Sequence, residues 1–144
     1  MKIVFWGTPE YCINTINSLY HSNHHISAII TQPDKRRNRG SKLIESATKK
    51  HALKLGIPVF TPEKIRNNIQ FVNQLLKINA DIYIVIAYGK ILPKEILDIP
   101  RLYSWNAHAS LLPLLRGAAP IQWSLINGDK TTGVSIIKMD EGLD

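Results

Sequence analysis

The chain has 144 residues, of which 44% are hydrophobic and 20% are charged, and its formal net charge is +7 at pH 7. This composition predicts one folded domain with its own core and excludes a disordered chain. A single cysteine, Cys12, excludes an intramolecular disulfide and a cysteine-ligated zinc site. No apolar stretch is long enough to span a membrane, and the apolar run at 3–6 stops too early for a signal peptide. We therefore expect a soluble protein of the cytoplasm, or of an organelle's stroma or matrix, without a membrane partner.

The first part of the chain predicts a strand–helix–strand unit. Residues 3–6 form an apolar run typical of a buried central strand, and residues 26–31 predict a second strand. Between them, Thr8 is predicted to cap a helix that begins at Pro9. Such units pack as right-handed parallel crossovers. The turn at 7–10 has neither the glycine-rich dinucleotide fingerprint nor a P-loop, so nicotinamide and nucleotide cofactors are not expected.

Much of the positive charge lies in one segment, residues 35–42 (KRRNRGSK), and indicates an anionic partner. The residues alone leave open a solvated surface loop, a nuclear localisation signal, and an arm that contacts a phosphate backbone. In the last case Arg39, between Asn38 and Gly40, is the arginine that we expect to reach deepest.

The middle of the chain predicts further elements of the same sheet. A helix is expected over 43–55, closed by Gly56, and a short edge strand over 57–60. A helical region then begins at 61. Its expected buried stripe consists of Ile69, Val72, Leu75 and Leu76.

The strongest strand signal is 81–87, which is nearly all apolar and β-branched and is therefore expected to be central. It ends in a turn at 88–93, on the edge of the sheet where open parallel sheets bind ligands. The remaining expected elements are a short helix over 93–97, a strand around Asn106, a helix over 118–126 and a strand over 131–139. The predicted fold is a doubly wound α/β domain with a mostly parallel sheet and helices on both faces.

Asn106 and His108 are the candidate chemical pair. Side chains alternate along a strand, so these two project from the same face. An asparagine amide can donate to a developing oxyanion, and an imidazole can donate or accept a proton near neutral pH. The alternative is that His108 is a satisfied structural histidine and Asn106 a turn residue. The pair alone does not decide between them, because it is short and common.

Several runs together resemble the folate-dependent formyltransferases, and within them most closely the branch that formylates an aminoacylated initiator tRNA. The runs are 106–113 (NAHASLLP), 116–122 (RGAAPIQ), 142–144 (GLD), 7–10 (GTPE), 31–34 (TQPD), 39–40 (RG) and 87–93 (AYGKILP). They follow one another in the family's order and spacing along the whole chain. The resemblance implies a Rossmann-like formyltransferase fold.

The resemblance also implies the reaction and its residues. A formyl group would pass from 10-formyltetrahydrofolate to the amino group of methionine on initiator tRNA, with Asn106, His108 and Asp144 as the catalytic set. Arg39 would contact the tRNA. The folate would bind at Ser110, Leu111, Leu112 and Pro113, and at Tyr88, Gly89, Lys90, Ile91 and Leu92. The folate serves as a co-substrate, and neither a metal nor a nicotinamide is expected. A monomer is expected.

The chain departs from the family pattern in places. Leu114 and Leu115 replace an arginine and an aromatic residue, and 45–49 replaces a proline-rich run. The family also continues beyond the catalytic aspartate and adds a β-barrel tRNA-binding domain. We therefore expect residues 1–144 to be a truncated N-terminal catalytic domain, incomplete at its C-terminus. The alternatives are a formyltransferase for a small amine, a formyltetrahydrofolate hydrolase, and a non-catalytic remnant that binds folate or RNA.

Overall fold

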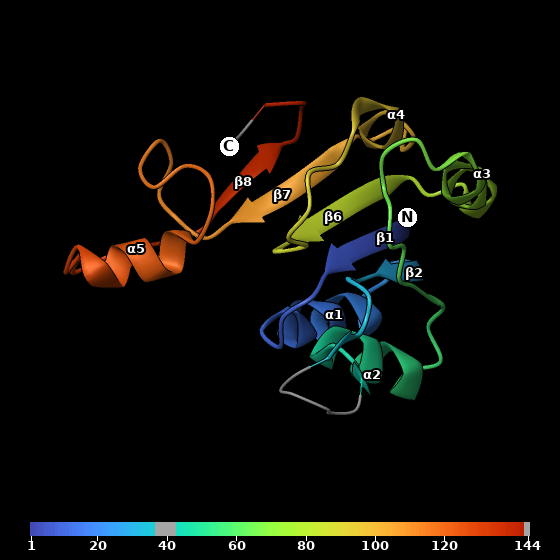
Figure 1. The fold of residues 1–144 in the computed structure, drawn as a ribbon, viewed down its shortest axis with the longest axis horizontal. Coiled ribbons are helices and arrows are strands. Elements are labelled where there is room, and N and C mark those ends of the chain that lie inside the picture. The colour runs from blue at the N-terminus through green and yellow to red at the C-terminus, as the bar shows by residue number, and fades with distance from the viewer. Residues whose placement is uncertain (37–42, 143–144) are drawn as a thin grey trace.

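The computed structural model describes residues 1–36 and 43–142 and centres on a six-stranded sheet of order β5-β2-β1-β6-β7-β8 (Figure 1). Neighbouring strands pair in parallel except β7 and β8, which are antiparallel. The strands are β1 (Lys2–Gly7), β2 (His25–Ile30), β5 (Val59–Phe60), β6 (Ile82–Ile86), β7 (Ser104–His108) and β8 (Ser135–Lys138). The predicted central strands, the edge strand over 57–60 and the mostly parallel sheet are confirmed.

Helices cover both faces of the sheet, as predicted for a doubly wound fold. The helices are α1 (Cys12–Tyr20), α2 (Ala47–Lys54), α3 (Ile69–Ile78), α4 (Lys94–Leu97) and α5 (Pro120–Ile126). α1 and α2 lie side by side and pack on the face of β1 that carries Phe5 (Figure 1). α3 and α4 pack on the opposite face, which carries Val4 and Trp6. This division follows from the alternation of side chains along β1.

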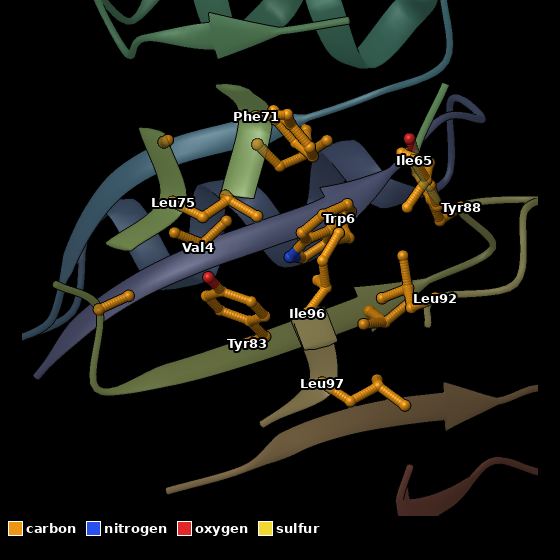
Figure 2. Close-up of a cluster of buried hydrophobic side chains, with 14 residues drawn as sticks. Val4, Trp6, Ile65, Phe71, Leu75, Tyr83, Tyr88, Leu92, Ile96 and Leu97 are labelled. Carbon is orange, nitrogen blue, oxygen red and sulfur yellow. The ribbon is translucent and has the colours of Figure 1, made fainter. Parts of the chain in front are cut away.

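Trp6 lies at the centre of the larger core cluster (Figure 2). Its ring contacts Tyr88, Tyr83 and Phe71, with ring centroids 5.1, 5.6 and 6.0 Å away. Aromatic pairs at these separations add to the stabilisation that burial alone provides. The cluster joins β1 and β6 to α3, and it holds the carboxyl ends of both strands in place.

The predicted starts of α1 and α2 are wrong. α1 begins three residues after Pro9, and Thr8 does not cap this helix. The Thr8 hydroxyl instead donates to the Tyr88 carbonyl and accepts from the backbone N–H of Gln32. α2 begins at Ala47 instead of 43, since Ser46 is its N-cap and accepts a hydrogen bond from the Lys49 amide at 3.0 Å. Tertiary contacts and a stronger capping residue outweigh the local pattern at both positions.

The buried stripe predicted for α3 is partly wrong. Ile69 and Leu76 are 77% and 53% exposed, whereas Phe71 and Leu75 are buried. Asn68 begins the helix by accepting a hydrogen bond from the Phe71 amide, and the helix is therefore shorter than expected. Leu75 is buried and Val72 is half-buried against the core, as predicted. Phe71 was missed because the stripe that faces the core consists of residues 71, 72, 75 and 78.

α5 extends beyond the sheet and contributes little to the core (Figure 1). Its exposed apolar side chains are Ile121, Trp123, Leu125 and Ile126. The predicted helix over 118–126 and strand over 131–139 are confirmed as α5 and β8, each shorter than expected. Within 1–36 and 43–142, no helix is both long and apolar enough to cross a membrane.

Candidate active site

The site forms where neighbouring parallel strands end. β1, β6 and β7 are adjacent and parallel, so the segments that follow Gly7, Ile86 and His108 meet at one edge of the sheet. The turn at 88–92 follows β6, and the loop at 110–115 follows β7. Ligands of open α/β sheets bind at this edge. The structure thus brings together the two segments that were predicted to bind folate.

Asn106 and His108 both lie in β7, whose ladder with β8 is uninterrupted from Trp105 to His108. The unbroken register preserves the alternation of side chains, which places the two on one face. Asn106 is half-buried, and His108 is 5% exposed. The strand predicted around Asn106 is confirmed.

His108 is held by the loop that follows it. Its Nε2 lies 2.9 Å from the carbonyl oxygen of Leu115. A backbone carbonyl can only accept, so Nε2 carries a proton and donates. In the neutral ring Nδ1 is then the basic nitrogen. Leu115 adopts a left-handed conformation with φ of 54°, which is costly for a leucine and marks a constrained loop. The histidine therefore has a defined orientation and a defined tautomer.

Ser135 of β8 ties the 110–115 loop to the sheet. Its hydroxyl donates to the Ser110 carbonyl at 2.8 Å and accepts from the Leu112 amide at 3.1 Å. The Ser110 hydroxyl in turn donates to the Leu114 carbonyl at 2.6 Å. Ser110 is buried, while Leu111 is half exposed. A pocket of about 230 Å³ lies beside this loop and is lined by residues 110–111, 114–115 and 129–132.

The turn at 88–92 can present mainly backbone to a ligand. The side chains of Tyr88 and Leu92 are 1% and 2% exposed and belong to the core (Figure 2). Burial raises the pKa of the Tyr88 phenol well above its ordinary value, so it stays neutral. Gly89 and Ile91 are exposed. The Lys90 ammonium donates to the carbonyls of Pro62 and Glu63 at 3.2 and 2.8 Å, which ties the turn to the segment after β5.

The basic segment has a short hairpin at its base, where a plain loop was expected. β3 (Lys35–Arg36) pairs antiparallel with β4 (Leu43–Ile44). Beside it, the Lys49 ammonium lies 2.7 Å from Asp34 and 3.0 Å from Glu45, and these carboxylates raise the pKa of Lys49. Arg39 lies outside the described residues.

Asp144, the expected third member of the catalytic set, also lies outside the described residues. Among residues 1–36 and 43–142, no group of three or more His, Cys, Asp or Glu side chains could hold a metal ion. Sequence reasoning missed Ser135, Gln32 and Thr8 as residues that support the site. Gln32 and Thr8 fall in runs that carry the family resemblance, but nothing in those runs indicates their partners.

Solved structures share this fold. Phosphoribosylglycinamide formyltransferase from Bacillus halodurans matches 100% of this chain and 74% of its own, with a TM-score of 0.76 at 20% identity. A formyltetrahydrofolate deformylase from Pseudomonas syringae pv. tomato matches 99% of this chain and 47% of its own, with a TM-score of 0.73 at 20% identity. The chain thus has the fold of formyl-group enzymes, with its polar pair at the strand ends.

The formyl transferase family model matches residues 1–144, and the chain belongs to that family. Methionyl-tRNA formyltransferase of Prochlorococcus marinus subsp. pastoris is 63% identical over 144 residues, and that of a Synechococcus species is 53% identical. Both alignments include the whole chain but only 44% and 42% of the relatives. The chain therefore spans less than half the length of these relatives.

Proposed function

We propose that residues 1–144 are the N-terminal catalytic domain of an enzyme that transfers a formyl group from 10-formyltetrahydrofolate to the amino group of methionine on initiator tRNA. The observation that carries this proposal is the Asn106 and His108 pair at the end of β7, beside the 110–115 loop. The relatives that match the whole chain at 53–63% identity bear the name methionyl-tRNA formyltransferase, which supports this acceptor over a small amine.

The residues suit formyl transfer to an amine. The amine attacks the formyl carbon, a carbon–nitrogen bond forms, and the carbonyl oxygen becomes negative. The Asn106 amide donates to that oxygen. The bond from the formyl carbon to the folate nitrogen then breaks, and His108 relays a proton from the attacking amine to the departing nitrogen. Asp144 stays ionised and supports the charged imidazole.

The substrates would occupy opposite parts of the same edge. The pterin of the folate would lie against the backbone of the 88–92 turn and the 110–113 segment. The acceptor stem of the tRNA would meet the basic segment that contains Arg39, where positive charge attracts phosphates. The net charge of +7 supports a polyanionic acceptor. No step in this scheme needs a metal ion or a nicotinamide.

The test is a formylation assay with 10-formyltetrahydrofolate and methionyl initiator tRNA, with formate release measured in parallel. We expect His108→Ala to lower kcat by about 10²–10⁴-fold and Asn106→Ala by about 10²–10³-fold. His51→Ala is the matched control, since His51 lies in α2 and bonds Asn17 at 2.6 Å. Full activity in the His108 variant would contradict the proposal. Formate release without formyl-methionine would show hydrolysis instead of transfer.

A further inference from the structure

The carbonyl oxygen of Tyr88 accepts two side-chain hydrogen bonds from segments far away in the sequence. Gln32 Nε2 donates to it at 2.9 Å, and Thr8 Oγ1 donates to it at 3.1 Å. Thr8 Oγ1 also accepts a hydrogen bond from the backbone N–H of Gln32 at 3.3 Å, which links the two donor residues. The segments that follow β1, β2 and β6 are therefore joined at one atom, at the edge where the candidate active site lies.

This arrangement fixes the peptide plane between Tyr88 and Gly89. A trans peptide directs its C=O and N–H in opposite directions. Because the carbonyl is held toward Gln32 and Thr8, the Gly89 N–H must point to the other side of the turn. A carbonyl oxygen has two lone pairs, and two donors already occupy those of Tyr88. The turn therefore presents the Gly89 N–H as a hydrogen-bond donor for a ligand, whereas the Tyr88 carbonyl oxygen already accepts two hydrogen bonds within the protein.

Gly89 matches this arrangement. Its φ is +81°, a conformation that favours glycine, and a Cβ built there would overlap Gln32 Nε2. The obstructing atom is the end of a flexible side chain, so position 89 could hold an alanine if the side-chain amide of Gln32 moved away from the Tyr88 carbonyl. A glycine at 89 and a bonded amide at 32 are thus parts of one arrangement.

We infer that Gln32 is a positioning residue for the formyl donor: its side-chain amide sets the Tyr88–Gly89 peptide so that the Gly89 N–H faces the folate. The inference rests on the proposed function, because that function supplies the folate. It assigns a role to the glutamine of the 31–34 run, which the catalytic scheme does not use. Lys90 holds the same turn through the carbonyls of Pro62 and Glu63.

The alternative is that Gln32 only ties strand ends together. The two roles differ in what they change. If Gln32 is only a structural tie, its removal should lower thermal stability and affect the binding of both substrates. If it is a positioning residue, its removal should weaken the binding of the formyl donor and leave the binding of tRNA unchanged. Asn17→Ala is the matched control, because it removes a half-buried side-chain hydrogen bond between α1 and α2, away from this edge.

The experiment is a double-mutant cycle of Gln32→Ala and Gly89→Ala. The probe is 10-formylfolate, a stable oxidised analogue of the donor, and its dissociation constant is measured alongside the KM for charged tRNA. We expect Gln32→Ala to weaken probe binding about fivefold, the size of one net hydrogen bond, with no change in KM for tRNA. Gly89→Ala should cost markedly less in the Gln32→Ala background than in the wild type, because the overlap is already gone.

Hydrogen exchange of the peptide that contains 88–92 gives a readout that needs no substrate. It should accelerate in both single variants and, in the double variant, by less than the sum of the two single effects. Strictly additive effects on exchange would overturn the inferred arrangement. Unchanged probe binding in Gln32→Ala, with a wild type that binds, would overturn the donor role and leave the proposed function standing. A wild type that binds no folate and transfers no formyl group would overturn the proposed function and the donor role together.

Discussion

Replacing Ser135 by alanine tests whether the 110–115 loop is part of the working site. The substitution removes one acceptor and one donor and leaves the Leu112 amide and the Ser110 carbonyl without these partners. Each half-buried hydrogen bond contributes about 1 kcal/mol net, so the ordered loop should lose about 2 kcal/mol relative to its disordered states. That loss corresponds to about 30-fold in the equilibrium that orders the loop. Since Leu115 of this loop orients His108, we expect kcat/KM for formylation to fall with the ordered fraction of the loop, by at most about 30-fold.

The assay is steady-state formylation by the purified Ser135→Ala protein, with the melting temperature measured on the same sample. Ser18→Ala is the control, because the exposed Ser18 hydroxyl donates to the Asn14 carbonyl within the same helix, α1, at 3.0 Å. That control should lie within about twofold of the wild type. If Ser135→Ala also stays within about twofold, then either the loop does not depend on Ser135 or it does not contribute to the reaction, and the reasoning above is refuted.

Further predictions concern stability. Phe71→Ala should lower the free energy of unfolding by about 3–5 kcal/mol in urea titrations, because it empties a core position, whereas Ile69→Ala in the same helix should change it little. The Lys2 amide and the Arg101 guanidinium hold the pKa of Asp81 below its ordinary value. The stability that this carboxylate contributes is therefore present above its unfolded pKa and is lost as pH falls through its lower folded pKa. The melting temperature of the wild type should fall more steeply than that of Asp81→Asn between about pH 4 and pH 2; parallel curves would refute this.

The parts of the candidate site that depend on local sequence patterns were predictable from the sequence. The strand that carries Asn106 and His108, the ligand-binding edge after 81–87 and the family runs are all visible in the sequence. The hydrogen bond from His108 to Leu115 was not, since it depends on the left-handed turn that the loop takes. Lys90 stays a predicted folate-site residue; what only the structure shows is that its ammonium donates to the backbone carbonyls of Pro62 and Glu63.

The sequence by itself determined the class of fold, because alternation and apolar runs are local properties of the chain. Phe5 must face the side of its strand opposite to Val4 and Trp6, and a strand with apolar side chains on both faces is stable only when both faces are covered. Tertiary structure alone decided which side chains support the site. Ser135 meets Ser110 across 25 residues and Gln32 meets Tyr88 across 56, through the order and register of strands. No local pattern encodes these distances, since a hydrogen bond depends on positions in space that the whole sheet sets.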